Sequence, residues 1–496
     1  MSPISGRKTP IIVALMTTLF LISIEVTIVS TAMPHIVKDL GGLQSMSWIF
    51  SAYLLTTVVS TPIFGKLLDL YGRKKIYLFG LIVFVLASAC SGFSQTMLQL
   101  ILFRAVQGLG AGALFPSVMT VTGTLFSQEE RAKIQAGFSA VGAVSGLAGP
   151  YVGGLFVDHL TWQWIFFLNV PIGLVCLLMF HFSYLERLER GKISIDVPGA
   201  LLFTAASTCL LLYFTSVNTT LLACSFALYA VFLFVERKKA ESALVPLGLF
   251  SNRALSLGFL ATFLLSTLYI GMNVYIPMWM QGGAGSNATD AGLTLAPMSV
   301  MWSVGAYLCG VWLGKKGSRF VCLSGMVLIT AGVVMLAALG SVPVTEWIVA
   351  AMVLVGSGMG LTTTAVMVAI QSEAKPSQLG SAMATLTFLN YMAQSIGISF
   401  FASVFNRSAL KGTEELRNQG LEIQNLNALL QFRHVGSASD TVRNAIRTVI
   451  AESVSGIFFY ILAFVVLAFA VVWFFRSQPP ENRAGAGREL AEAADQ

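Results

Sequence analysis

The chain has 496 residues, of which 56% are hydrophobic and only 11% are charged, and its formal net charge is +7. A soluble domain carries about 25% Asp, Glu, Lys and Arg, so the composition excludes an ordinary soluble protein. The basic residues are spread over many loops instead of forming one patch, which argues against a nucleic-acid partner. Apolar runs of roughly 20 residues, each able to cross a ~30 Å hydrocarbon core, indicate a polytopic helical membrane protein.

Fourteen apolar segments follow one another along the chain. We predict transmembrane helices at 11–33, 47–68, 76–94, 97–125, 134–157, 164–184, 197–215, 220–236, 255–281, 291–314, 320–339, 346–371, 379–404 and 452–475. These runs lack the alternation of apolar and polar residues that the strands of a membrane barrel show. An even number of spans places both ends of the chain on the same side.

The distribution of Lys and Arg predicts which side is cytoplasmic. With both ends inside, the inner loops hold most of the 30 basic residues, and the short outer loops hold only Lys38. Positively charged short loops stay on the cytoplasmic side. We therefore predict a multi-pass plasma-membrane protein, of the kind found in bacterial inner membranes, with cytoplasmic termini and an extracellular segment at 405–451.

One carboxylate, Glu25, interrupts the first apolar run in "SIEVTIVSTAMPHI" (23–36). A charge at the bilayer centre costs at least about 2.5–3.5 kcal/mol on insertion scales, so such residues usually face a cavity or a partner and carry function. A carboxylate held between desolvation and a nearby cation can bind either a proton or a cationic substrate. We predict that Glu25 couples proton movement to transport; the alternative is a structural Glu bonded between helices.

Arg104 is the only Lys or Arg that we place deep in a span. It lies seven residues in from Met97, and Glu25 lies eight residues in from Met33. At about 1.5 Å per residue, both sit roughly 10–12 Å below the outer surface. We predict that Arg104 tunes Glu25, directly or through water. The alternative is that the five donors of Arg104 tie helix backbones together.

A weak internal repeat suggests two related halves. "GKLLDLYGRK" (65–74) follows the second span, and "GVWLGKKGSR" (310–319) follows the tenth. Paired halves are typical of secondary transporters. We predict an N-terminal six-helix bundle at 1–184, two inserted linker helices at 185–240, a C-terminal six-helix bundle at 241–475 and a disordered cytoplasmic tail at 476–496.

We predict that the first copy of this repeat forms a tight inner loop that can act in gating. Gly65 would let two helices approach, and Gly72 would permit a turn. Asp69 can cap a helix or pair with an arginine, contacts that break easily. Arg73 also helps to fix the topology.

Small residues crowd the fifth span around Gly149 and Pro150. Small residues permit close helix packing, and proline removes a backbone hydrogen bond. We predict an outer gate here, with simple packing as the overlapping alternative.

Aromatic and amide side chains suggest a wall for flat lipophilic cations. Such walls bind by cation–π and dispersion contacts, although membrane aromatics usually face lipid or neighbouring helices. The candidates are Tyr53, Tyr269, Asn273, Tyr275, Trp279, Asn390 and Gln394. His35, near the outer end of the first span, is a further candidate for the proton path.

Several ordered motifs resemble those of the major facilitator superfamily, and in particular its fourteen-span drug:proton antiporters. The matching stretches are "IEVTIVSTAMP" (24–34), "GKLLDLYGRKK" (65–75), "RAVQGLGAG" (104–112), "SGLAGPYVGG" (145–154) and "WQWIFFLNVPIG" (162–173). The resemblance covers nearly the whole chain. It implies that the loop at 65–75 locks the cytoplasmic ends of the two halves in one state and releases them in the other.

Two departures from that family narrow the expectation. The first-span motif usually carries Asp, and here Glu25 keeps the carboxylate with one more methylene. The thirteenth span, 380–405, has no acidic residue, although some polyspecific members carry acids in late spans. This favours lipophilic or monovalent cationic substrates over divalent cations.

We therefore expect a proton-driven exporter of drugs, dyes or biocides that works by alternating access. Protons are the coupling ion; the chain needs no other cofactor, contacts membrane lipids and works as a monomer. An exporter of an endogenous metabolite or antibiotic, a lipid translocase, and a membrane-embedded enzyme using Glu25 and Arg104 remain alternatives. The enzyme lacks a recognisable nucleophile or metal cluster, and the sequence holds no phosphate-binding loop for an ATP motor.

Overall fold

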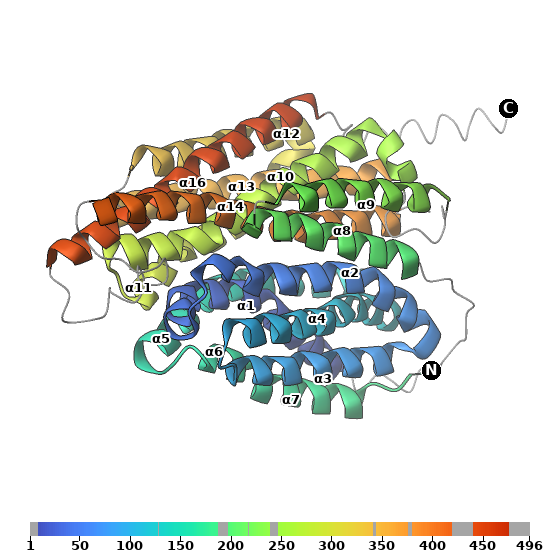
Figure 1. The fold of residues 1–496 in the computed structure, drawn as a ribbon. Helices are drawn as coiled ribbons and strands as arrows, with labels where there is room; N and C mark the ends of the chain where they lie inside the picture. Colours follow the sequence, from blue (N-terminus) through green and yellow to red (C-terminus); the bar gives the residue numbers. More distant parts are fainter. Residues whose placement is uncertain are drawn as a thin grey trace.

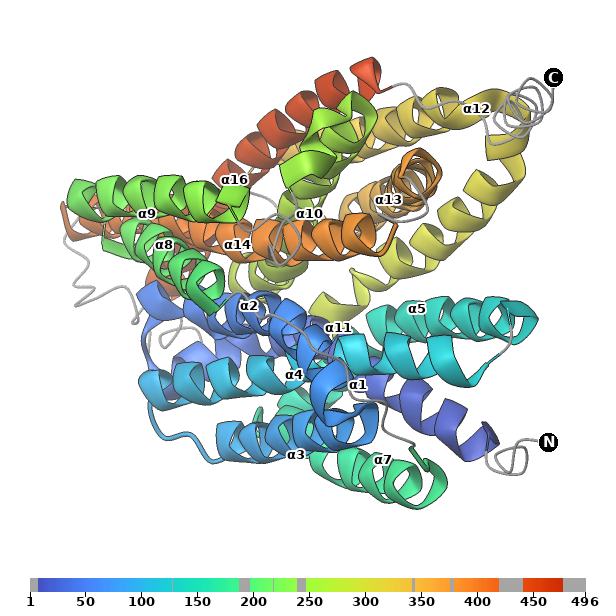
Figure 2. The ribbon, with the colours of Figure 1, turned by 90° about the vertical axis from the view of Figure 1, so that its right-hand side faces the viewer.

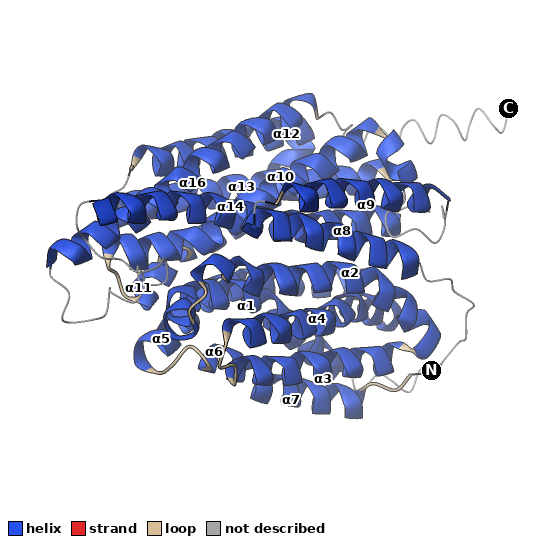
Figure 3. Cartoon of the chain, in the orientation of Figure 1, coloured by secondary structure: helices blue, strands red, loops and turns tan. Residues whose placement is uncertain are grey.

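A computed structural model describes residues 8–126, 128–186, 197–216, 218–238, 247–340, 344–374, 379–418 and 440–475. Its longer helices are α1 (Lys8–Leu40), α2 (Ser47–Tyr71), α3 (Arg73–Gly92), α4 (Met97–Leu125), α5 (Gln128–His159), α6 (Trp164–Phe167), α7 (Asn169–Ser183), α8 (Val197–Ser216), α9 (Thr219–Lys238), α10 (Arg253–Trp279), α11 (Ala288–Leu293), α12 (Ala296–Ala338), α13 (Thr345–Glu373), α14 (Leu379–Asn418) and α16 (Asp440–Phe474). Short turns of helix are η2 (Leu43–Ser45), η3 (Leu247–Ser251) and the π-helical η4 (Met280–Ala284). In the described parts of the chain, every regular element is helical (Figure 3).

The helices confirm the predicted membrane architecture. Within the described ranges, thirteen helical segments are long and apolar enough to cross a bilayer. The described apolar stretch of α8, Pro198–Phe214, is shorter, although α8 itself has 20 residues. Each predicted span therefore corresponds to a helix. The even number of crossings brings the start of α1 and the end of α16 to one side of the molecule, opposite α11 (Figure 1).

Two helices extend into the segment between the last two predicted spans. The span placed at 379–404 continues as helix to Asn418 in α14, and α16 already begins at Asp440, so both helices enter the segment predicted as extracellular. Phe405, Ala409 and Leu416 are buried, which shows that the apolar face of α14 persists beyond the predicted end. Residues 419–439 and the predicted tail 476–496 lie outside the described residues.

The helices form two bundles with the inserted pair between them (Figure 1). Helices α1–α7 pack on one another, and α10–α14 pack with α16. The bundles meet where α1 contacts α10, where α2 contacts α14, and where α5 contacts α11 and α12. Figure 2 shows the α2–α14 contact and the α5–α12 contact on opposite sides of this interface.

The sequence repeat has a structural counterpart. Gly72 joins α2 to α3 with φ 92° and ψ 151°. Gly317 breaks α12 with φ 75° and ψ 160°. Residues other than glycine rarely adopt positive φ, so the two halves share the same glycine-dependent turn at equivalent places.

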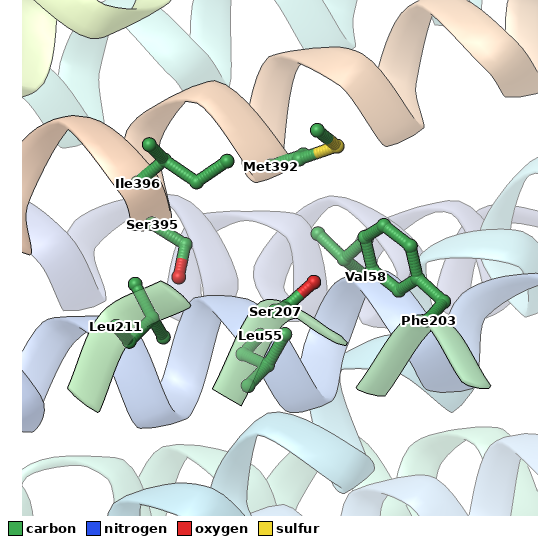
Figure 4. A pocket seen from close by; sticks show the side chains of 8 residues that line it. All are labelled: Leu55, Val58, Phe203, Ser207, Leu211, Met392, Ser395 and Ile396. Carbon is green, nitrogen blue, oxygen red and sulfur yellow. The ribbon is translucent and has the colours of Figure 1, made fainter. Parts of the chain in front are cut away.

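The inserted helices cover the α2–α14 side of the interface. Helix α8 contacts both α2 and α14, and the ring of Phe203 lies 4.7 Å from that of Phe388 on α14. Figure 4 shows the junction, a cavity of about 10 Å³ lined by Leu55, Val58, Phe203, Ser207, Leu211, Met392, Ser395 and Ile396. That volume holds about one water molecule at most, so the three helices close this side tightly.

Candidate functional site

Glu25 and Arg104 form a buried ion pair in the N-terminal bundle. Arg104 Nη1 lies 2.5 Å from Glu25 Oε1. The side chains are 0% and 1% exposed for Arg104 and Glu25, respectively. The pairing predicted from equal depth is therefore present, between the middle of α1 and the first third of α4.

The second oxygen of Glu25 is held from a third helix. Asn169, at the start of α7, donates from Nδ2 to Glu25 Oε2 at 2.9 Å. The same amide nitrogen donates to Ser88 Oγ of α3 at 2.9 Å, and Ser88 Oγ donates to the carbonyl of Phe166 at 2.9 Å. Both carboxylate oxygens thus have donors, which offsets the cost of burying the charge.

Arg104 also serves the structural role that was the alternative. Its Nε donates to the backbone carbonyl of Ile49 at 3.2 Å, and its Nη1 donates to Gln107 Oε1 at 2.7 Å. Its guanidinium carbon lies 4.3 Å from the ring centroid of Tyr53, a cation–π contact. Arg104 therefore ties α4 to α2 while it pairs with Glu25, so the two readings hold together.

Three buried polar atoms around the pair have no hydrogen-bond partner among the described residues: Arg104 Nη2, Gln107 Nε2 and the Tyr53 hydroxyl. Unsatisfied buried donors are costly. These atoms can bind a water molecule or a polar group of a substrate without displacing an existing bond. Tyr53 lies on α2, which packs against α14, so the site borders the C-terminal bundle.

The structure divides the predicted substrate residues into separate groups. Tyr53 joins the ion pair, and Gln394 donates to Asn390 at 2.5 Å within α14. Tyr269 packs against Trp302 with ring centroids 5.4 Å apart. The remaining rings face the interior of the C-terminal bundle, where Tyr275 lies 5.8 Å from Phe405 and Trp279 lies 5.0 Å from Phe458.

Asn273 lies one turn from Tyr269 and is 1% exposed. Its Nδ2 has no hydrogen-bond partner in the described part of the chain. Tyr53, Asn273 and Gln394 are buried and Asn390 is half-buried. The Tyr275 hydroxyl and Trp279 Nε1 are also buried without a hydrogen-bond partner among the described residues, so these rings too bring polar atoms to the interior.

The segment 65–75, predicted as a tight inner loop, is helical except at Gly72, and it contains a contact that the sequence did not reveal. Glu186, just after α7, accepts backbone N–H bonds from Arg73 at 2.6 Å and Lys74 at 2.9 Å. It thereby caps the start of α3. Gly65 faces open space, with no described atom within 4 Å of an added Cβ, so the predicted close approach is absent in this conformation. The side chain of Asp69 lies outside what the structure describes.

Close packing explains the glycines of α5. A Cβ on Gly149 would collide with Thr27 of α1, at 2.9 Å from its Cβ. A Cβ on Gly153 would lie 2.8 Å from the carbonyl oxygen of Ile28. On the other face, the carbonyl of Pro150 contacts Gly292 of α11. The predicted gate residues thus lie where α5 meets both α1 and the C-terminal bundle.

Sequence reasoning missed two members of the ion-pair network. Gln107 follows Arg104 by three residues, a spacing that places both on one helix face. Asn169 is the one amide in the apolar run "WIFFLNVPIG" (164–173). A polar residue inside a span was therefore the available signal, but its partner could be identified only once α7 was placed beside α1.

Replacing Asn169 with Leu is expected to lower transport about tenfold. The change leaves Glu25 Oε2 without its donor, and an unsatisfied buried acceptor costs roughly 1–3 kcal/mol. Ser88→Ala is the matched control, because Ser88 accepts a hydrogen bond from Asn169, so the change removes a bond of Asn169 instead of the bond to Glu25. Initial transport rates at equal protein levels test this; wild-type rates for Asn169→Leu would remove Asn169 from the site.

No cluster of three or more His, Cys, Asp or Glu side chains suited to a metal occurs in the described segments. The site is instead a network of the Glu25 carboxylate, the Arg104 guanidinium and the amides of Asn169 and Gln107, all within the N-terminal bundle. Such a network can gain or lose a proton or exchange a polar partner.

Solved structures share this fold. A bacterial homologue of the human lysosomal transporter Spinster, in an inward-facing and occupied conformation, matches with a TM-score of 0.69 and 13% identity, over 95% of this chain and 97% of that one. A D-xylose–proton symporter matches with a TM-score of 0.64 and 12% identity, over 96% and 99%. At these identities the likeness shows the fold alone.

Sequence relatives are closer. Multidrug resistance protein 3 of Bacillus subtilis (strain 168) is 31% identical over 483 residues, 94% of each chain. The multidrug transporter protein MdtP of the same organism is 33% identical over 81% of this chain and 76% of its own length. The family model of the Major Facilitator Superfamily matches residues 15–398. The chain belongs to the Major Facilitator Superfamily.

Proposed function

We propose that the protein is a proton-coupled antiporter that exports lipophilic or monovalent cationic drugs, dyes or biocides. The observation that carries this proposal is the buried network of Glu25, Arg104 and Asn169. An acid that is 1% exposed in a membrane protein and held by breakable bonds is a natural site for a coupling proton. The substrate class is supported by the two Bacillus subtilis relatives, a multidrug resistance protein and a multidrug transporter.

The exchange uses competition at one site. When Glu25 is ionised, its charge balances that of Arg104, so a cation can bind near Tyr53. When Glu25 takes a proton, the charge of Arg104 is no longer balanced and repels the cation. A substrate shifts an equilibrium only by its difference in affinity between states, and protonation supplies that difference.

The topology gives the exchange its direction. Both termini are cytoplasmic in this proposal, so the side on which α5 meets α11 faces outward. The contacts of α5 with α11 close that side in this conformation. The protein works as a monomer in the plasma membrane among lipids, with protons as its coupling ion and no further cofactor.

Purified protein in liposomes tests the function. We expect an imposed pH gradient, acid inside, to drive accumulation of a monovalent cationic dye, because outflowing protons are exchanged for the dye. Collapsing the gradient with an ionophore should reduce accumulation to that of protein-free liposomes. Accumulation that ignores the gradient would contradict proton coupling, and a complete lack of dye transport would instead favour an endogenous metabolite as the cargo.

A further inference from the structure

Asp158, near the end of α5, reaches across to the C-terminal bundle. Its Oδ1 accepts the backbone N–H of Ala288 at 3.0 Å. Its Oδ2 accepts the backbone N–H of Thr289 at 2.8 Å and the Thr289 hydroxyl at 2.5 Å. One carboxylate of the N-terminal bundle thus holds the start of α11 by three hydrogen bonds.

These bonds complete the capping of α11. The first N–H groups of a helix have no partner within the helix. Asn287 is the local cap, and its Oδ1 accepts from the backbone N–H of Asp290 at 2.7 Å. The N–H groups of Ala288 and Thr289 remain, and Asp158 takes both. Hydrogen bonds from N–H groups at a helix start to a carboxylate are stronger than neutral ones.

The surrounding residues fit this contact closely. A Cβ on Gly154 would lie 2.6 Å from the backbone nitrogen of Thr289 and 2.9 Å from the carbonyl carbon of Ala288. Gly154 therefore lets α5 approach the same two residues that Asp158 binds one turn later. The Gln281 amide adds a parallel contact between bundles by donating to the carbonyl of Thr31 at 2.9 Å.

The hydrogen bonds of Asp158 can break at low cost. Asp158 is exposed, so water can replace the N–H groups when the bundles separate, and neither the carboxylate nor the helix start is left unsatisfied. Glu25 differs, because it is 1% exposed and water cannot replace its partners without a large opening.

We propose that Asp158 is a positioning residue of the transport cycle that latches α5 to α11 while the outer side is closed. Release of the latch accompanies outward opening. The latch depends on neither the identity of the substrate nor the coupling ion, although its place on the outer side rests on the topology of the proposed function. Its charge-assisted hydrogen bonds add to the close helix packing around Gly149 and Pro150.

The test measures the distance between the bundles on this side. Spin labels at Leu160→Cys and Leu410→Cys, both exposed and on opposite bundles, are attached in a background without the six native cysteines. We expect Asp158→Ala to raise the ratio of long to short distances about three- to tenfold, in line with the loss of a helix cap. Thr289→Val, which removes one of the three bonds, should give a smaller shift in the same direction.

Asp39→Asn is the matched control. Asp39 accepts from Trp162 Nε1 at 3.0 Å, a contact that stays within the N-terminal bundle. Asp39→Asn removes one negative charge, as Asp158→Ala does, and should leave the distance ratio at the wild-type value. An unchanged ratio in both Asp158→Ala and Thr289→Val would overturn the latch, and so would an equal shift in Asp39→Asn.

This experiment is separate from the transport assay. If the distances shift while no dye is transported, the latch stands and the proposed substrate class fails. If dye transport is proton-driven while the distances do not shift, the function stands and the latch fails.

Discussion

Glu25→Gln is expected to abolish gradient-driven uptake while the protein still folds. Glutamine has the shape of glutamate, and its amide oxygen can still accept a bond from Arg104, while its Nε2 replaces the oxygen that accepts from Asn169. It cannot carry an exchangeable proton. Dye accumulation in liposomes under an acid-inside gradient should therefore drop to that of protein-free liposomes, with a cooperative thermal unfolding transition as the check on folding.

Glu25→Asp serves as the control for chemistry. It keeps the carboxylate but shortens its reach by one methylene, so uptake should persist at a reduced rate. Uptake by Glu25→Gln equal to wild type would make Glu25 structural and move the coupling proton elsewhere. A loss in both variants with normal folding would show that position and charge are both required.

Arg104→Ala is expected to give the largest loss of stability among these variants. It leaves a buried carboxylate without its cation, which typically costs about 3–5 kcal/mol. It also removes the bond to the Ile49 carbonyl and the cation–π contact with Tyr53. Thermal unfolding in detergent should move to clearly lower temperature, and uptake should be lost.

The double variant separates pairing from general disruption. If Arg104 matters mainly as the partner of Glu25, adding Glu25→Gln to Arg104→Ala should recover part of the lost stability, because no buried charge is then left unpaired. Groups in contact give non-additive effects of 0.5–3 kcal/mol. Additive losses would show that the Ile49 and Tyr53 contacts are the main contribution of Arg104.

Much of the architecture could be predicted from the sequence because the bilayer imposes simple rules. A helix must be about 20 apolar residues long to cross, and basic residues mark one side. These rules located the helices, and equal depth along two of them predicted the Glu25–Arg104 pair. They do not tell how far α14 continues past its predicted span, where Phe405 and Ala409 stay buried. Burial there comes from packing between helices, which hydropathy does not report.

The missed site residues share a physical cause. Asn169 and Gln107 meet the ion pair because α7 and α4 lie beside α1, and Glu186 meets the start of α3 only after α7 has crossed back. Asp158 contacts residues 130 positions away. Each is one polar residue near an apolar run, and no local pattern identifies its partner. The roles of Tyr275 and Trp279 stay a prediction, since the pattern around them does not distinguish a cavity wall from packed rings.

Proton release on substrate binding tests the central claim most directly. Purified protein in weakly buffered detergent solution, at a pH where Glu25 is partly protonated, is mixed with the cationic dye while a pH indicator is followed. If proton and substrate compete at Glu25, wild type should release up to about one proton per dye bound, and Glu25→Gln should release none. Dye binding by wild type without proton release, or equal release by Glu25→Gln, would contradict the account.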